Sequence, residues 1–494
     1  MKSTTTTDET DETEKQSSTP RKKAIPTAFI PKNKKTAGGR ELQKTDNLDR
    51  RRKRYETSKH PTIIIYDLRK GVTAYDRYGW RCWGTDVISN TKSKSAGMEN
   101  TAVSGEFTDN GVLACAYATG ILGIDTRDGR VAWKKDALWK EYSFNSAAKN
   151  YDETERPILV FQNGEYALIL TELQIRHPYT QREVDGKRIV EGGDIKLQGR
   201  ARALRLADGK ECWNASEFEK VLALTENYAI LSKNGGRTVE TVSLKTGKET
   251  KTVDLGKDPP AAFYAKGNTI AYAPAPAVVD VKAPARICLL DESGKTPGTT
   301  ITEKRGGGII KSLSISNNSE LLATVTQYRD EKTGKATDDY VITVYSKKGK
   351  NYSPAWNKQT SDPVVALKFD PETEHLIAKT PHFNDKSCSF ETDVITSYDP
   401  CKGDRQWVHE CRTRYVMEDD VVDPLNWERI NRQTMTPSYD GLIYIGDHDR
   451  GVCVLDTSNG ELIEQIRIEP AVNNNKLQYT PTKIKSIAVR RNYR

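Results

Sequence analysis

From about residue 110 onward, short apolar runs and polar turns recur in one order. Each copy has an apolar run, a polar loop, a second apolar run, a turn of the type Asp/Thr/Ser-x-Gly-Lys/Arg, and a more polar third run. The fullest copies cover residues 120–135 and 200–214, and residues 438–468 contain three runs in order. The apolar runs lack helical spacing, and runs such as 341–345 and 442–445 are short, which favours strands over helices. We therefore predict an all-β body built from repeated hairpins.

Glycine marks the turn of each copy. A tight hairpin places one residue at positive φ, where glycine has no Cβ to clash. In three copies a tryptophan follows the glycine by four positions, on the polar third strand that we expect at the outer rim. The predicted structural turn residues are Gly129, Trp133, Gly209, Trp213, Gly247, Gly294, Gly349, Gly403, Trp407 and Gly460.

The spacing of these glycines predicts the size of the repeat. Their separations are 80, 38, 47, 55, 54 and 57 residues. A four-stranded propeller blade takes about 40–50 residues, so most gaps fit one blade with its loops. The first gap requires an insertion, and residues 177–197, which are polar and rich in turn formers, are expected to form an extended hairpin between two strands.

Two turns share the longer pattern Asp-x-x-x-Gly-x-x-x-Trp, from Asp125 to Trp133 and from Asp399 to Trp407. This pattern resembles the repeats of the quinoprotein-alcohol-dehydrogenase-like (PQQ-like) propellers and, more loosely, WD40 and YVTN repeats. The resemblance extends from about residue 61 to the end, with three or four degenerate copies. It implies a β-propeller. Quinoprotein dehydrogenases use pyrroloquinoline quinone on calcium and often a vicinal disulfide, and this chain has no adjacent cysteines, so the resemblance implies no cofactor and no activity.

The two ends of the chain predict how the ring closes. Residues 482–489 resemble strands that open other blades, and residues 61–71 form an isolated strand and turn that can complete such a blade. Their pairing would close the ring and hide two sheet edges. We expect seven blades, with eight as the alternative if residues 61–107 and the C-terminal strand make a blade of their own. The predicted domains are a tail over residues 1–60 and a propeller over residues 61–494.

Net charge separates the tail from the rest. Residues 1–60 hold 16 Lys and Arg against 9 Asp and Glu, a net charge of +7, within a chain whose total is +8. Apolar residues are too few to offset the roughly 1–2 kcal/mol per residue that backbone ordering costs, so we predict disorder. The basic residues proposed for nuclear import or phosphate contact are Arg21, Lys22, Lys23, Arg50, Arg51, Arg52, Lys53 and Arg54.

Candidate chemistry is sparse. The eight cysteines include no CxxC pair, which excludes a locally encoded zinc ribbon, and we interpret most as small buried hydrophobic residues. Asp447, His448 and Asp449 form a compact cluster that we interpret as a solvated loop. His409 and Cys411 stand at alternate positions of a predicted outer strand, which strand alternation explains. We predict no catalytic, cofactor-binding or metal-binding residue.

The expected function follows from the architecture. A ring of blades presents loops on two faces from a rigid frame, which suits a non-enzymatic protein-interaction scaffold or adaptor with protein partners. One alternative is a subunit of an RNA or DNA complex anchored by the basic tail, and another is a quinoprotein-like enzyme with a site in the propeller channel. The N-terminus lacks a secretory signal and the chain has no run of 18 apolar residues, so we expect an intracellular protein of the nucleus or cytoplasm without a membrane partner.

Overall fold

The computed structural model describes the chain in segments. They are residues 35–36, 40–41, 61–67, 71–77, 79–85, 102–107, 111–117, 120–136, 138, 152–176, 179–185, 187–192, 195–218, 220–224, 227–234, 236–255, 260–266, 269–274, 281–290, 300–349, 351–384, 389–412, 435–447, 451–466 and 484–490. All regular secondary structure within these segments is β-strand. In the same segments, no helix has the length and hydrophobicity that crossing a bilayer requires. The all-β prediction is confirmed.

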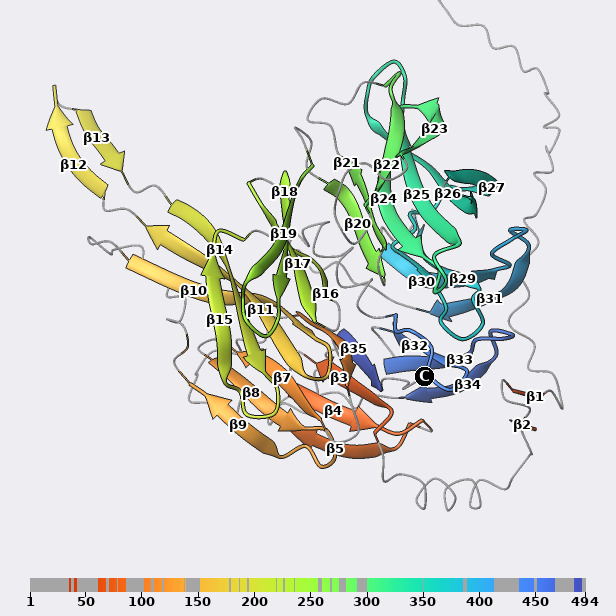
Figure 1. Cartoon of the computed structure of the whole chain (residues 1–494), viewed down its shortest axis with the longest axis horizontal. Helices are drawn as coiled ribbons and strands as arrows, with labels where there is room; N and C mark the ends of the chain where they lie inside the picture. The colour runs from red at the N-terminus through yellow and green to blue at the C-terminus, as the bar shows by residue number, and fades with distance from the viewer. Residues whose placement is uncertain are drawn as a thin grey trace, which may run out of the picture.

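The strands form eight blades arranged around a ring (Figure 1), so the alternative blade count is the correct one. Blade A contains β35 (Ile484–Arg490), β3 (Ile63–Asp67), β4 (Gly71–Tyr75) and β5 (Arg81–Thr85). Blade B is the three-stranded sheet of β7 (Val112–Tyr117), β8 (Gly120–Asp125) and β9 (Val131–Lys135), and β6 (Ala102–Phe107), which precedes it in the chain, belongs to the sheet that contains blades A and C. Blade C contains β10 (Asp152–Gln162), β11 (Tyr166–Arg176), β14 (Ile195–Arg205) and β15 (Glu211–Ser216).

The next three blades are regular four-stranded antiparallel sheets. Blade D has β16 (Lys220–Leu224), β17 (Tyr228–Lys233), β18 (Thr238–Ser243) and β19 (Glu249–Asp254). Blade E has β20 (Pro260–Lys266), β21 (Thr269–Pro274), β22 (Pro284–Leu290) and β23 (Thr300–Gly306). Blade F has β24 (Gly308–Ile315), β25 (Leu321–Arg329), β26 (Ala336–Lys348) and β27 (Asn351–Thr360).

The last two blades complete the series. Blade G has β28 (Ala366–Phe369), β29 (Leu376–Asn384), β30 (Ser389–Tyr398) and β31 (Arg405–Arg412). Blade H has β32 (Leu442–Asp447), β33 (Gly451–Asp456) and β34 (Leu462–Ile466), with Met435 bridging to Ile445 at the inner edge. Within the predicted tail, the structure describes only the two-residue strands β1 (Lys35–Thr36) and β2 (Arg40–Glu41).

The ring closes as the sequence predicts, by pairing the two ends of the propeller. In blade A the C-terminal strand β35 pairs antiparallel with β3, with Val489 opposite Ile63. The strand β6 then pairs in parallel with β35 of blade A on one side and with β10 of blade C on the other. Parallel pairing fits a propeller whose innermost strands all run in one direction. These bonds join blade A, β6 and blade C into one nine-stranded sheet at the point of closure, while β7, β8 and β9 form a separate sheet.

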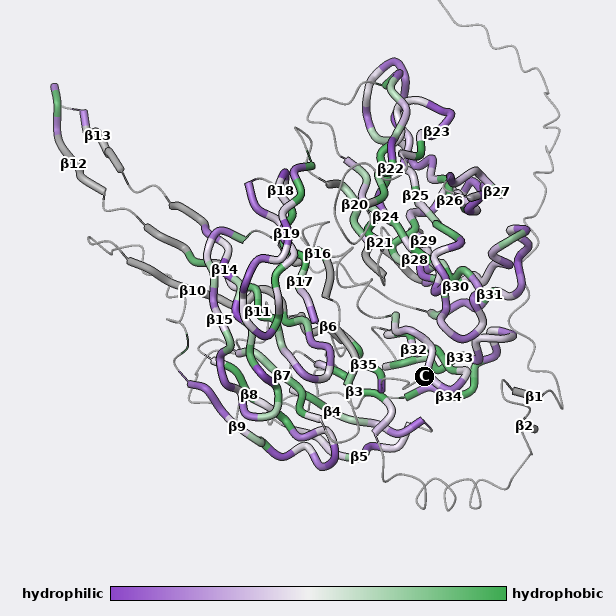
Figure 2. Tube along the Cα trace, viewed as in Figure 1, coloured by the Kyte–Doolittle hydropathy of each residue, from purple (hydrophilic) through white to green (hydrophobic). Residues whose placement is uncertain are grey.

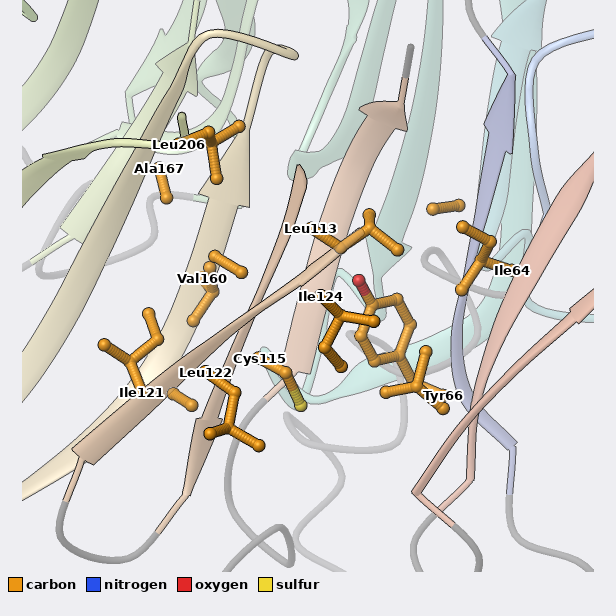
Figure 3. Packing of buried hydrophobic residues seen from close by; sticks show 14 of the residues in the cluster. Ile64, Tyr66, Leu113, Cys115, Ile121, Leu122, Ile124, Val160, Ala167 and Leu206 are labelled. Carbon is orange, nitrogen blue, oxygen red and sulfur yellow. The ribbon is translucent and has the colours of Figure 1, made fainter. Parts of the chain in front are cut away.

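Hydropathy falls from the inner strands of each blade to the outer strand (Figure 2). In blade B, every residue of β7 after Val112 is buried, whereas β9 alternates between half-buried and exposed positions. Inner strands lie between two neighbouring sheets and can be apolar on both faces, while outer strands meet solvent. Figure 3 shows the result where blades A, B and C meet: Tyr66, Leu113 and Val160 pack in one cluster.

Candidate functional site

The turn glycines and tryptophans come together in pairs, each pair joining one blade to the next. A Cβ added to Gly129, Gly209, Gly247, Gly403 or Gly460 would lie within 2.7 Å of a tryptophan ring of the preceding blade. The partners in that order are Trp83, Trp133, Trp213, Trp356 and Trp407. A tryptophan therefore docks on the glycine of the following blade and not on the glycine of its own turn.

The local geometry of the turn explains this docking. In the turn of blade H the Gly460 amide donates to the Asp456 carbonyl at 2.8 Å, and Gly460 has φ of 70°. Asp456 also caps the turn, because its Oδ1 accepts from the Ser458 amide at 2.9 Å. The turn leaves the carbonyl of the residue three before the glycine free to accept from the docked indole. Five indoles make this bond, at 2.6–3.0 Å, to the carbonyls of Thr126, Leu206, Leu244, Pro400 and Thr457.

A β-bulge at one position of the outer strand aims each of these side chains. In blade G the register shifts between Ser397 and Tyr398, and Trp407 is the residue opposite Ser397 at the bulge. Seven blades carry an equivalent shift between their third and fourth strands, namely blades A, B, C, D, F, G and H. A bulge places two residues opposite one and redirects the side chain beside it. The position holds Lys251 in blade D and Glu464 in blade H, so the indole is not conserved around the ring.

In the joint between blades H and A, side chains other than tryptophan lie against the turn glycine. A Cβ added to Gly79 would lie 3.0 Å from Ile466 Cγ1 and 3.4 Å from Glu464 Cγ. Arg77 and Asp440 form an ion pair across the same joint. Trp83 and Trp356 are not among the turn residues predicted from the sequence. Trp83 follows Gly79 by the expected four positions, whereas Trp356 follows Gly349 by seven, outside the pattern.

The joint between blades E and F contains a buried carboxylate. Nothing lies within 4 Å of a Cβ added to Gly349, although its φ is 64°. Glu303 of blade E accepts instead from Thr326 Oγ1 at 2.7 Å, Tyr328 Oη at 3.2 Å and Tyr345 Oη at 3.4 Å, all from blade F. Burial raises the pKa of Glu303, and the three hydroxyl donors partly oppose that rise.

A histidine and two cysteines meet between blades G and H. One ring nitrogen of His409 and the sulfurs of Cys411 and Cys453 lie within 4.8 Å of one another, and all three residues are buried. His409 and Cys411 are two residues apart on β31 and share a face, and Cys453 comes from β33. A hydrogen bond from Cys411, helped by His409 and Lys379, lowers the pKa of Cys453 to about 6 despite burial.

A fully buried ion pair lies on the same face of blade G. Lys379 Nζ is 3.0 Å from Asp393 Oδ2, and both side chains are 0% exposed. Asp393 is the cross-strand partner of Cys411, which places this pair beside the histidine and cysteines. The sequence contained one signal for this cluster, the alternation of His409 and Cys411. Cys453 belongs to another blade, and only the folded ring shows that it completes the group.

Several predicted residues lie outside the described segments. They are Gly294, His448, Asp449, Cys388 and all eight basic residues proposed for the tail. None of the seven described cysteines forms a disulfide, and Cys115, Cys411 and Cys453 are buried. Between β11 and β14 of blade C, the strands β12 (Tyr179–Val184) and β13 (Lys187–Gly192) pair as a hairpin, which agrees with the insertion predicted over residues 177–197.

Comparisons with known proteins find structural likeness at low sequence identity. No family model matches the chain, and no curated protein matches it. Among solved structures, the complex of KlAtg21 with the coiled coil of AgAtg16 is 10% identical, covers 74% of this chain and 98% of that chain, and has a TM-score of 0.44. BamB from Moraxella catarrhalis is 11% identical with coverages of 65% and 88% and a TM-score of 0.34. Hydrazine synthase from Kuenenia stuttgartiensis is 8% identical with coverages of 63% and 80% and a TM-score of 0.37.

The glycine joints can be tested with a matched pair of substitutions. Gly460→Ala and Gly349→Ala both place alanine at positive φ, at a cost of about 1–2 kcal/mol each. Only the new Cβ at residue 460 would meet an indole, so we expect Gly460→Ala to cost about 1–3 kcal/mol more in the free energy of unfolding. Equilibrium denaturation measures both. The excess should shrink in a Trp407→Ala background, and equal losses for the two variants would argue against the joint.

Glu303 gives a pH-dependent prediction. Because its folded pKa is raised, protonation of Glu303 favours the folded state, and this contribution is full below the unfolded pKa and lost as pH rises through the folded pKa. Relative to Glu303→Gln, the native chain should therefore gain stability on acidification from neutral pH. Denaturant unfolding over a pH series measures the difference. Glu331→Gln, at an exposed position of blade F, is the control and should follow the native chain throughout. A difference that stays flat for Glu303→Gln would contradict a raised pKa.

Proposed function

We propose that the protein is a non-enzymatic scaffold or adaptor that binds a protein partner through the β12–β13 hairpin. The observation that carries this proposal is the projection of the hairpin away from the ring (Figure 1). The strands β11 and β14 of blade C pair along 11 residues, from Tyr166 opposite Arg205 to Arg176 opposite Ile195. The hairpin then continues outward as a separate two-stranded sheet.

The hairpin has properties that suit recognition. Glu183, Val184, Asp185 and Lys187 at its tip are exposed. An isolated two-stranded hairpin is marginally stable in water, and both of its edges present backbone groups that can pair with another strand. A partner that adds a strand to such an edge gains main-chain hydrogen bonds and stabilises the hairpin at the same time. The ring behind it provides a fixed base, since five indole bonds join its blades.

Removal of the hairpin tests this proposal. Arg176 and Ile195 are register partners, so an Asn-Gly turn can replace residues 177–194 and join β11 directly to β14. We expect the full chain to recover a partner in stoichiometric amount by affinity purification, and the shortened chain to lose it at an unchanged melting temperature.

The control uses an equivalent change elsewhere on the ring. Arg329 and Ala336 are also register partners, so residues 330–335 between β25 and β26 can be replaced in the same way. This variant should keep the partner. Loss of the partner from both variants, or retention by both, would contradict a role for the β12–β13 hairpin.

We also propose that the propeller is of the PQQ-like kind, on the basis of its Asp-x-x-x-Gly-x-x-x-Trp turns.

The basic tail supports a second function class. Residues 15–60 carry 15 Lys and Arg against 4 Asp and Glu, a density of charge that suits nuclear import or contact with phosphates of RNA or DNA. These two uses of the tail differ in how they depend on salt concentration. Phosphate binding weakens as salt rises because it depends on counterion release, whereas import depends on recognition by a receptor.

Deletion of residues 1–60 separates the two uses of the tail. If the tail binds nucleic acid, the intact chain should be retained on RNA and DNA columns at low salt and released as salt rises, while the truncated chain passes through. Gln at each position from Arg50 to Arg54 should give intermediate retention. Equal retention of the intact and truncated chains would exclude the tail as the nucleic-acid contact.

A further inference from the structure

The histidine and two cysteines between blades G and H bring three potential metal donors together in a buried interface. His409 and Cys411 project from β31, and Cys453 projects from β33 of the next blade. Buried apolar side chains of both blades pack around them, including Ile395, Ile443 and Leu455, and the buried ion pair of Lys379 and Asp393 lies beside them. The donors are therefore held apart from solvent by residues of both blades.

The imidazole of His409 has one ring nitrogen, Nδ1, that is buried and lacks a hydrogen-bond partner among the described residues. A buried polar atom without a partner costs about 1–3 kcal/mol, so proteins normally satisfy such atoms. The side chain is only 6% exposed, which limits what water can supply. The two thiols lie close enough to His409 for all three side chains to contact one common ion.

We propose that His409, Cys411 and Cys453 bind one zinc ion, which joins blade G to blade H. Thiolate and imidazole are the donors that structural and catalytic zinc sites use, and two cysteines with one histidine form a known ligand set. In a tetrahedral zinc site with Zn–S bonds of about 2.3 Å, neighbouring donors are about 3.8 Å apart. The observed limit of 4.8 Å lies within a small side-chain adjustment of that value.

Charge also favours a dication. Two thiolates and one Zn²⁺ sum to zero, so binding the ion with release of both thiol protons would bury no net charge, whereas a monovalent or trivalent ion would leave one. The neighbouring Lys379 and Asp393 neutralise each other and add nothing to this balance. Asp393, as the cross-strand partner of Cys411, also provides an oxygen donor beside the site. Trp407, two residues before His409, docks on Gly460 in the same joint, so the ion would reinforce an existing contact.

The experiment measures metal content and coordination in the full chain. The chain is purified after refolding with zinc under reducing conditions, dialysed, and analysed by atomic emission, and we expect about one equivalent of bound zinc. Cobalt(II) added in place of zinc should give the thiolate charge-transfer band and the intense visible bands of tetrahedral coordination. Both signals arise without any variant, so they do not depend on a substitution being tolerated.

The variants Cys453→Ala and His409→Ala assign the ligands. Loss of one ligand should weaken zinc binding by more than the roughly 10–100-fold that loss of a ligand's outer hydrogen-bond partner costs. Cys115→Ala is the matched control, because Cys115 is a free and fully buried thiol in another joint. It should keep full zinc content. Circular dichroism confirms that each variant retains strand structure, and alanine suits these apolar surroundings.

Three results would overturn the proposal. The first is a native chain without bound zinc after refolding with the metal. The second is zinc content that is equal in the native chain and in Cys453→Ala, because the ion would then lie elsewhere. The third is a Cys411–Cys453 disulfide in the protein purified from its host without reductant, detected by mass spectrometry, since this bond would consume both sulfur ligands.

Discussion

The docking of an outer-strand side chain on the turn glycine of the next blade is the contact on which the ring depends. This contact combines two features, each of which contributes little stability by itself. A glycine at positive φ opens space over the turn, and an indole fills that space while donating to a carbonyl that the turn leaves unpaired. One such hydrogen bond contributes only about 0.5–1.5 kcal/mol net to stability, but an equivalent bond occurs between five pairs of neighbouring blades. Because each blade contacts only its neighbours, the joints set the stability of the array nearly pair by pair.

Polar groups are buried in two of the interfaces between blades, one with and one without a docked indole. Between blades E and F the described turn glycine meets no indole, and Glu303 collects three hydroxyl donors from blade F. Between blades G and H the indole of Trp407 is present, yet the inner part of the same interface holds Lys379, Asp393 and the histidine-cysteine cluster. Apolar packing alone would stabilise either interface at lower desolvation cost. Buried polar groups instead fix which blade surfaces fit each other, which matters in a ring of similar repeats.

The sequence revealed the repeats because a turn is a local structure. Gly129, Gly209 and Gly403 are each tied to a strand pair and a capping side chain within a few residues, so their pattern survives in the linear chain. What each tryptophan contacts could not be read in this way. Trp133 stands four residues from Gly129 but docks on Gly209, because the bulge turns its side chain toward the next blade. The blade count depended on the same non-local information, since blade A is assembled from chain ends more than 400 residues apart.

The buried cluster illustrates a further limit and its physical origin. Alternation along β31 explains why His409 and Cys411 share a face, and that much is visible in the sequence. Whether a shared face is solvated or buried depends on the neighbouring blade, and the third member, Cys453, reaches the cluster from the far side of that interface. A site formed by residues of two blades therefore lacks a short, recognisable spacing in the sequence. In a propeller, donors contributed by adjacent sheets are separated in the chain by roughly one repeat, so the informative pattern is a residue pair offset by one blade length and placed on facing strand surfaces.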